Sequence, residues 1–492
     1  MTSSKFIALA MLVAASRGLA PAATPYTADW PSLTRHRVPA WYEDAKFGLY
    51  FHWSAYSVPA YSNEWYSHDM YQAGGDVNHH HVATYGPLAK FGYKDFIPLF
   101  TAAKFNADEW ADLIVRSGAQ YAGPVAEHAD GFSLWDSRVN PWNAAKMGPK
   151  RDLVAELEQA IRRRHLKFIT TFHHQWLWGW FGSDVPDADV KDPANFSFYG
   201  PALPTTAFNY AHPEPAPDRA FCATWAAKVA EVVDRYQPDL IYFDSRTMII
   251  DEPTRQQMLA HFYNTAQAAG REVVMNYKNE DFAPGAGILD LEGGRMTKVT
   301  DFKWQTDDQM DWNSWAYLEH PNYKSADRLI HQLIDIVSKN GNLLLDVGPR
   351  PDGTIPQPVQ ERLLAIGDWL RTNGEAIYGT RPFAVFGEGP TKIKEGQFTE
   401  KDLAGFTAQD IRFTTKPGVL YATLLGWPAD GKAVITTLAE PGGQAIAPIR
   451  SVELLGHAGA LKWQRSAAGL TVELPAQAPG AHAWVLKISL GG

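Results

Sequence analysis

The chain has 492 residues, of which 45% are hydrophobic and 20% charged, so collagen-like, coiled-coil and wholly disordered architectures are excluded. The formal net charge is −9 and no long Lys/Arg-rich tract occurs, which excludes nucleic acid as the expected partner. The single cysteine, Cys222, excludes an intramolecular disulfide and a CxxC metal or redox site.

Residues 1–22 have the pattern of a secretory signal peptide. Lys5 precedes ten apolar residues at 6–15, and Ala20-Pro21-Ala22 supplies the small-x-small pattern that a signal peptidase accepts. We therefore expect a mature chain that begins near Ala23 and is secreted or periplasmic. No segment has the about 18 consecutive apolar residues of a membrane-spanning helix, so no membrane insertion is expected.

Short β-rich runs alternate with longer amphipathic stretches between residues 46 and 348. The candidate strands are 47–52, 121–127, 168–173, 240–244, 273–277, 288–292, 302–306 and 343–347. The helical patterns are 107–117, 152–165, 217–236, 254–269 and 325–339. This alternation predicts a (β/α)8 TIM-like barrel that is irregular between the fifth and seventh strands, where no helical pattern occurs. An open doubly wound sheet is the alternative, but no GxGxxG motif follows the first strand.

The pattern changes after a further predicted helix at 357–372. Short alternating runs separated by Gly, Pro and Asp follow at 411–415, 419–424, 433–438, 452–455 and 483–488. Such runs predict an antiparallel β-sandwich of roughly 110 residues. We assign residues 23–379 to the barrel and 380–492 to the sandwich.

Polar residues stand at the carboxyl ends of the predicted barrel strands. In a packed barrel the functional groups gather at this end, because the loops that follow the strands converge there around an open mouth. The residues at or just after the strand ends are His52, Glu127, His128, His173, His174, Asp244, Asn276, Lys278, Glu292, Gln305, Asp307 and Asp346. Any one of them could be a turn or cap residue, but the collection predicts a site.

Two carboxylates among them suit the chemistry of a glycosidase. An apolar strand leads directly into Asp244, where a buried carboxylate is costly unless donors compensate it; the alternative role is a helix N-cap. Glu292 is followed by two glycines that allow a sharp turn, and its alternative role is a solvated loop residue. In glycosidases one carboxylate attacks or stabilises the anomeric carbon and the other protonates the leaving oxygen.

Metal-assisted hydrolysis is the competing chemistry for such a barrel. His52, His128, His174 and Asp244 are residue types that bind zinc, but no HxH or HExxH spacing lies on the strands. The triplet at 79–81 is expected in a loop spanning 74–87. Serine chemistry lacks a GxSxG elbow, and phosphate binding lacks a glycine-rich cradle.

The chain resembles the α-L-fucosidases of glycoside hydrolase family 29 over about residues 41–380. The resemblance rests on an ordered set of short motifs, among them Glu127-His-Ala-Asp-Gly-Phe132 and Asn63-Glu-Trp-Tyr66. The others are 41–48, 51–53, 135–137, 148–153, 243–244, 290–292, 304–307, 315–317, 340–349, 352–356 and 373–378. The family implies a barrel with a C-terminal β-sandwich and a retaining double displacement that releases L-fucose from fucosylated glycans.

The resemblance implies a role for each matching residue. Asp244 matches the nucleophile, and Glu292 is assigned as the acid/base by its place after the fifth-strand region, with Glu280 and Glu64 as reserves. The residues implied to contact the sugar are His52, Glu64, Trp65 and His128, with Trp315 as a wall for the fucose methyl group and His174 placed by its position at the third strand end. Neither chemical step needs a metal or another cofactor.

Several residues depart from the family pattern. Ala129 stands where many members have a second histidine, so one hydroxyl contact is expected to be missing or supplied from elsewhere. Ser245 and Ser54 replace glycines, and Asp346 stands where asparagine is common. Two alternatives remain: a glycosidase for a related sugar such as an α-L-galactoside, and a non-catalytic glycan-binding protein. The sequence leaves the oligomeric state open.

Overall fold

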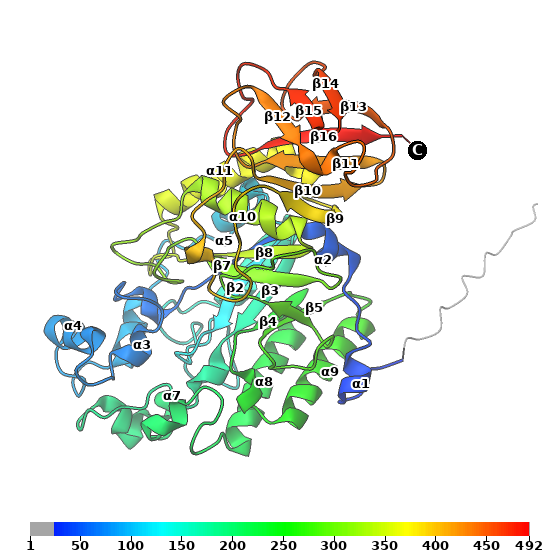
Figure 1. The fold of residues 1–492 in the computed structure, drawn as a ribbon. Coiled ribbons are helices and arrows are strands. Elements are labelled where there is room, and N and C mark those ends of the chain that lie inside the picture. The colour runs from blue at the N-terminus through cyan, green and yellow to red at the C-terminus, as the bar shows by residue number, and fades with distance from the viewer. Residues whose placement is uncertain (1–23, 492) are drawn as a thin grey trace, which may run out of the picture.

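Eight parallel strands close into a barrel in the computed structural model, which describes residues 24–491 (Figure 1). The barrel strands are β1 (Phe47–Phe51), β2 (Tyr121–Glu127), β3 (Lys167–Phe172), β4 (Leu240–Phe243), β5 (Val274–Lys278), β6 (Ile288–Asp290), β7 (Trp304–Gln309) and β8 (Gly341–Val347). They pair in chain order, and β8 returns to β1. The predicted barrel is therefore confirmed; β7 begins two residues later than expected and extends to Gln309.

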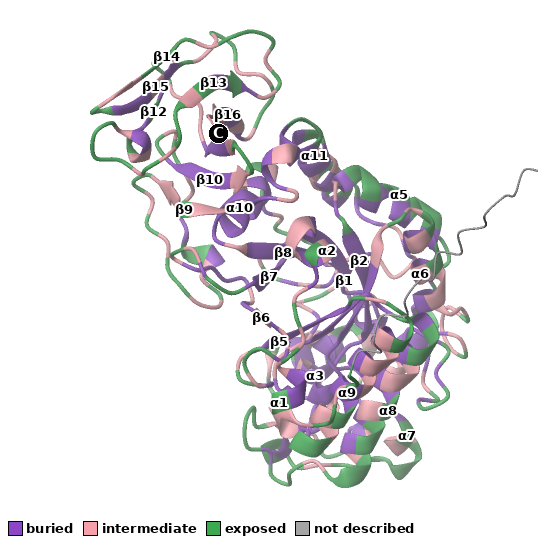
Figure 2. Cartoon of the chain, turned by 90° about the vertical axis from the view of Figure 1, so that its right-hand side faces the viewer, coloured by how far each residue is buried: buried purple, intermediate pink, exposed green. Residues whose placement is uncertain are grey.

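Helices cover the outside of the barrel, with buried faces toward the strands and exposed faces toward solvent (Figure 2). The larger ones are α5 (Ala107–Ser117), α6 (Leu153–Arg163), α8 (Arg219–Tyr236), α9 (Glu252–Ala268), α10 (Ala326–Ser338) and α11 (Gln357–Asn373). Local chemistry sets their ends: the Asn106 side chain caps α5, and Gly118 ends it in the left-handed conformation with φ 86°. Between β5 and β6, and between β6 and β7, the described chain forms no helix, as predicted.

Short helices lie before β1 and in the segments that follow β1 and β3. They are α1 (Trp30–Leu33), α2 (Ala40–Ala45), α3 (Tyr66–Asp69), α4 (Asp76–Tyr85) and α7 (Phe196–Tyr199). The predicted loop at 74–87 is wrong, because α4 occupies most of it. His81 of this helix is buried, its Nδ1 lying 3.0 Å from the Tyr66 hydroxyl and its Nε2 2.9 Å from the Phe91 carbonyl oxygen, so it packs α4 against α3 and the segment at Phe91.

The C-terminal part forms two antiparallel sheets packed on a separate apolar core. One sheet has the order β13-β16-β11-β10-β9 and the other β12-β15-β14. The strands are β9 (Arg381–Glu388), β10 (Ile411–Lys416), β11 (Val419–Leu424), β12 (Lys432–Ile435), β13 (Ile449–Leu454), β14 (Trp463–Ser466), β15 (Gly469–Glu473) and β16 (Trp484–Leu490). The predicted sandwich is confirmed, although β9, β14 and β15 were not among the expected strands.

Buried charges join the sandwich to the barrel beside α10. Asp335 of α10 accepts hydrogen bonds from Arg412 of β10 at 2.6 Å and from Arg295, in the loop after β6, at 2.7 Å. Lys339 donates to the same carboxylate at 2.7 Å. All four side chains are almost fully buried, and Arg295 also pairs with the buried Glu400. Because an unpaired buried charge is costly, this contact between the two parts depends on these charge pairs.

The barrel interior changes from apolar to polar along its axis. An inner cluster that includes Val125, Ile169 and Leu344 fills the closed barrel. Above it, the hydroxyls of Tyr50 and Tyr242 each donate to Asp307 at 2.9 Å. This layer forms the floor of an open cavity at the carboxyl ends of the strands.

The proposed signal peptide at residues 1–22 lies outside the described residues. Among the described helices, none combines the length and the apolar character needed to cross a bilayer.

Candidate active site

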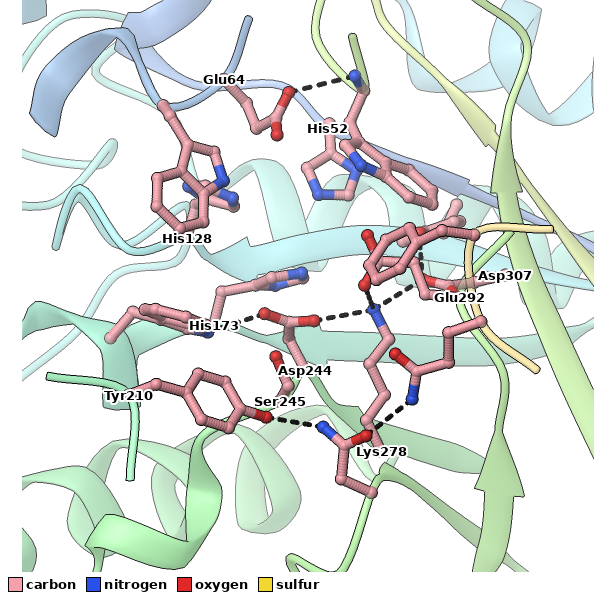
Figure 3. A pocket seen from close by; sticks show the side chains of 17 residues that line it. His52, Glu64, His128, His173, Tyr210, Asp244, Ser245, Lys278, Glu292 and Asp307 are labelled. Atoms are coloured by element: carbon pink, nitrogen blue, oxygen red, sulfur yellow. Dashed lines mark hydrogen bonds and ion pairs between the residues drawn. The ribbon is translucent and has the colours of Figure 1, made fainter. Parts of the chain in front are cut away.

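A cavity of about 560 Å³ opens at the carboxyl ends of the barrel strands (Figure 3). Its lining combines carboxylates, histidines and aromatic rings. The lining residues are Tyr50, His52, Glu64, Trp65, His128, His173, Trp176, Tyr210, Asp244, Ser245, Lys278, Asn279, Glu292, Asp307, Trp315, Gln397 and Phe398. All but one of the predicted site residues are therefore brought together here, and the exception is His174.

Asp244 directly follows β4, and its carboxylate is held by two donors. Lys278 Nζ lies 2.8 Å from Oδ1, and Trp176 Nε1 donates to Oδ2 at 2.7 Å. The backbone N–H of Asp244 donates to the carbonyl oxygen of Phe172 at 3.1 Å, which continues the pairing of β3 with β4. The carboxylate therefore enters the cavity in a fixed orientation and with compensation for its partial burial.

Glu292 reaches the same lysine from the loop after β6. Lys278 Nζ donates to Glu292 Oε2 at 2.6 Å. Gly293 turns the chain with φ 48° and donates its N–H to the carbonyl oxygen of Asp307 at 2.8 Å. Burial raises the pKa of Glu292 to about 7; the nearby Lys278 opposes this rise, and the charges of Asp307 and Asp244 add to it. A proton donor near neutral pH is the property that a general acid requires.

The shared lysine limits how far apart one oxygen of Asp244 and one oxygen of Glu292 can lie. Because Asp244 Oδ1 and Glu292 Oε2 bind one nitrogen at 2.8 and 2.6 Å, their separation cannot exceed the sum of those distances. That limit agrees with the about 5 to 5.5 Å of retaining glycosidases and lies below the about 6.5 Å at which inverting spacings begin. This spacing favours a carboxylate that attacks the sugar directly over one that activates an intervening water.

His52 is oriented by a buried carboxylate behind it. Its Nδ1 lies 2.8 Å from Asp346 Oδ1, so Nε2 is left to face the cavity. Burial lowers the pKa of His52, but the charge and hydrogen bond of Asp346 outweigh burial and raise it overall. Burial also raises the pKa of Asp346 to about 6, with His52 opposing the rise. The pair fixes the ring and its tautomer.

Three histidine rings meet on one wall. The ring centroid of His128 lies 5.4 Å from that of His52 and 4.8 Å from that of His173. Burial lowers the pKa of His128 and of His173 well below the usual value, so both rings are neutral. Their Nδ1 atoms have no protein partner, and one nitrogen from each ring lies within 4.8 Å of the others. The three rings can bind sugar hydroxyls or a transition-metal ion.

Glu64 and two indoles complete the upper part of the cavity. Glu64 is buried and accepts from the backbone N–H of Trp315 at 3.1 Å, and burial raises its pKa. The ring centroid of Trp315 lies 5.4 Å from that of His52. Trp65 packs edge-on against Trp176, with 5.3 Å between the ring centroids. These flat apolar surfaces beside polar groups suit a sugar ring.

His174 does not line the cavity, so its predicted placement in the site is wrong. Its Nε2 lies 3.2 Å from the carbonyl oxygen of Trp225 in α8, and its ring stacks on that indole. Behind it, Glu127 is paired with Lys228 in the wall between the barrel and α8. The neighbour, His173, takes the cavity position. The reserve acid Glu280 is exposed and outside the cavity, whereas Glu64 lies inside it.

Several cavity residues were not assigned a role from the sequence. His173 and Lys278 were noted at strand ends without one, and the strand period alone could have indicated that only one of two adjacent histidines faces inward. Trp176 lies in the loop after β3. Gln397 and Phe398 come from the segment between β9 and β10, more than 100 residues beyond Glu292 in the chain, and no local pattern indicates them.

Comparisons with known proteins show which families and structures this chain is similar to. The family model described as "Alpha-L-fucosidase" matches residues 13–375, and "Alpha-L-fucosidase C-terminal domain" matches residues 405–489. The tissue alpha-L-fucosidase of Rattus norvegicus is 33% identical over 98% of this chain and 96% of its own, and that of Homo sapiens 31% identical over 94% and 92%. The crystal structure of Thermotoga maritima alpha-fucosidase in complex with fucose is similar with a TM-score of 0.72, at 29% identity over 94% of this chain and 100% of that chain.

Proposed function

This chain belongs to the alpha-L-fucosidase family of glycoside hydrolases, and from that premise we propose that it is a retaining exo-α-L-fucosidase with Asp244 as nucleophile and Glu292 as acid/base. Its substrates are fucosylated glycans or oligosaccharides that present a terminal L-fucose. The observation that carries the assignment of the two carboxylates is their common contact with Lys278.

In the first step, an oxygen of Asp244 attacks the anomeric carbon of fucose. The bond between that carbon and the glycosidic oxygen breaks, and Glu292 gives its proton to the departing oxygen. Lys278 and Trp176 hold the carboxylate of Asp244 aimed at the carbon, because each donates to one of its oxygens. Because the pKa of Glu292 is raised to about 7, its carboxyl group still carries a proton to donate near neutral pH.

In the second step, a water molecule attacks the same carbon from the side that the leaving group vacated. Glu292, now ionised, takes the proton from that water, and the ester bond to Asp244 breaks. Two inversions give net retention of configuration. The charge of Lys278 supports Glu292 in this ionised form, so one cation serves both carboxylates in turn.

The remaining cavity residues bind the sugar in this proposal. The imidazoles of His52, His128 and His173 and the carboxylate of Glu64 bind the fucose hydroxyls, and Trp315 packs against the fucose methyl group. The family pattern has a second histidine where this chain has Ala129. His173 supplies an imidazole beside His128 at a ring distance of 4.8 Å, and so compensates for that replacement.

A hydrolysis assay with 4-nitrophenyl α-L-fucoside tests the function. The wild-type chain releases nitrophenol and α-fucose as the first product, and Asp244→Gly is expected to lower kcat by at least about 10⁴-fold, since loss of a catalytic nucleophile costs about 10⁶-fold elsewhere. Glu280→Gln is the matched control, because that carboxylate is exposed outside the cavity. Near-normal activity of Asp244→Gly, or β-fucose as first product, would overturn the assignment.

We also propose that the protein is secreted or periplasmic. The pattern of residues 1–22 supports this, with a lysine, ten apolar residues and a small-x-small site before residue 23. N-terminal sequencing of the exported protein tests it, with Ala23 expected as the first residue.

A further inference from the structure

One part of the cavity edge consists of residues that the proposed mechanism does not use. Tyr210, Asn279, Gln397 and Phe398 line the opening, and we call these four residues the outer rim. They come from three separate parts of the chain: the loop before α8, the end of β5, and the segment between β9 and β10. The last of these belongs to the C-terminal part of the protein, so this part contributes directly to the cavity.

Backbone hydrogen bonds fix the segment 396–400 to the loop that carries Glu292. The N–H of Phe398 donates to the Glu292 carbonyl oxygen at 2.7 Å, and the N–H of Glu400 donates to that of Gly293 at 2.9 Å. Arg295 and Gly396 exchange two further bonds, of 3.0 and 3.1 Å. Phe398 is therefore held immediately beside the proposed acid/base.

Phe398 is exposed in a backbone conformation that an aromatic residue seldom adopts. Its side chain is 55% exposed, the highest value among the large hydrophobic residues that are exposed in the described chain, and its φ is 57°. A bulky residue in the left-handed region is strained, and such strain concentrates at binding sites. Phe398 and Tyr210 are both exposed and both line the cavity, and apolar surface of this kind beside a cavity is typical of ligand-binding grooves.

A hydrogen-bond chain connects the other three members of the outer rim, as Figure 3 shows. Asn279 Nδ2 donates to the Tyr210 hydroxyl at 2.6 Å, and Gln397 Nε2 donates to Asn279 Oδ1 at 2.6 Å. The Tyr210 ring is 39% exposed and packs on the indole of Trp176 at 5.7 Å. The rim thus presents two exposed rings with amide groups between them.

The chemistry of the first step determines which part of the substrate lies at the outer rim. The general acid protonates the glycosidic oxygen, so the group attached to that oxygen must extend from the sugar past Glu292. Resting on the proposed function, we infer that the outer rim is the binding subsite for the leaving group, and that this group is a hexopyranose sugar whose apolar face packs on Phe398 and Tyr210. The amides of Asn279 and Gln397 then meet its hydroxyls.

Two substrates that share fucose but differ in leaving group test this inference. One is α-L-fucosyl fluoride, whose leaving group is a single atom, and the other is α-L-fucosyl-(1→2)-D-galactose. For Phe398→Ala, the ratio of kcat/KM on the disaccharide to kcat/KM on the fluoride is expected to fall about tenfold, the typical effect of an aromatic contact. Phe398→Trp is expected to retain most of the ratio. Phe302→Ala, which removes a ring that is 47% exposed outside the cavity, is the matched control and leaves the ratio unchanged.

Transfer to an added sugar provides a second readout that a supporting role would not change. With fucosyl fluoride as donor and methyl β-D-galactopyranoside as acceptor, a sugar hydroxyl replaces water: its oxygen bonds to the anomeric carbon, the bond to Asp244 breaks, and Glu292 takes the proton. The ratio of transfer product to free fucose is expected to fall in Phe398→Ala and in Tyr210→Ala.

The outcomes separate this inference from the proposed function. Equal losses on both substrates, with an unchanged transfer ratio, would mean that Phe398 only supports the Glu292 loop and would overturn the subsite. No loss on either substrate would overturn it as well. A wild-type chain inactive on both substrates would instead contradict the proposed function.

Discussion

His173 and His174 are consecutive residues whose rings face opposite sides of the barrel wall. His173 lies 4.8 Å from the ring of His128 inside the cavity, whereas His174 stacks on Trp225 of α8. Both are buried, and burial lowers both pKa values, that of His174 to about 4. Only the direction of each side chain at the end of β3 distinguishes a sugar contact from a packing residue.

Substitution of these two histidines is expected to separate activity from stability. His173→Ala removes a neutral imidazole from the cavity, so kcat/KM on 4-nitrophenyl α-L-fucoside should fall about 10-fold or more, the effect of one lost hydrogen bond. His174→Ala leaves a cavity in the wall and should lower the free energy of unfolding by about 2 to 4 kcal/mol. Kinetics and thermal melting of both variants check this, and a larger kinetic effect in His174→Ala would contradict the geometry.

The sequence located most of the site because strand ends are easy to recognise. Apolar runs that stop at Asp244, His52 or Glu292 indicate both a strand and a polar group at its end, and the barrel then brings these ends together. Two adjacent histidines cannot be distinguished in this way, because consecutive side chains of a strand point to opposite faces. The direction of the His173 side chain could therefore be established only from the structure.

Contacts between segments that are distant in the chain could not be predicted from any local sequence pattern. Phe398 reaches the cavity because the segment 396–400 pairs with the Glu292 loop, and residue spacing does not encode that pairing. The helix α4 was missed for a different reason: its sequence, with Gly74-Gly75 before it and Gly86-Pro87 after it, favours a loop, and tertiary contacts of His81 override the weak local preference. The strand β14 is short, largely polar and at the edge of its sheet, so its alternation is weak.

The pH dependence should report the proton on Glu292. The general acid must be protonated in the free enzyme, and its pKa is raised to about 7. kcat/KM on 4-nitrophenyl α-L-fucoside is therefore expected to fall as pH rises through about 7. In Glu292→Gln, assayed with a 2,4-dinitrophenyl fucoside that needs no acid, this fall should disappear; constant kcat/KM up to pH 9 in the wild type would rule out Glu292 as the titrating acid.

Loss of the cation between the two carboxylates should impair the nucleophile. Lys278 is buried; burial lowers its pKa, but Asp244, Asp307 and Glu292 together raise it well above the usual value, so it stays charged. In Lys278→Met the two carboxylates lose their shared donor and positive charge, the pKa of Glu292 rises further, and kcat should fall about 10²- to 10³-fold. The alkaline fall of kcat/KM should also move to higher pH. Lys278→Arg keeps the charge as control, and a Met variant as active as the Arg variant would contradict this role.

The charge cluster around Asp335 should contribute strongly to stability. Asp335→Asn leaves Arg295, Lys339 and Arg412 close together without their shared carboxylate, and all are buried. The expected loss in the free energy of unfolding is about 3 to 5 kcal/mol. Asp368→Asn, which removes an exposed ion pair with Arg371 on α11, is the control and should cost less than about 1 kcal/mol. Urea unfolding of both variants measures the difference, and equal midpoints would contradict the assignment.

Added zinc should inhibit the enzyme by occupying the three-histidine wall. His128 and His173 are neutral with unpartnered Nδ1 atoms, and His52 has Asp346 behind its Nδ1, the arrangement of a carboxylate that orients a metal-binding imidazole. Their nitrogen atoms lie close enough to share one ion.

Zn²⁺ should therefore compete with the fucoside, and a chelator should reverse the inhibition. The chelator alone should leave activity unchanged, because neither chemical step uses a metal. Co²⁺ should show the visible absorption of a tetrahedral site. His173→Ala removes one of the three ligands and should weaken zinc inhibition at least about tenfold, since loss of a residue that only orients a ligand already costs that much. His79→Ala, on the exposed face of α4, is the control and should not change the inhibition. Inhibition of equal strength in both variants would mean that zinc binds elsewhere.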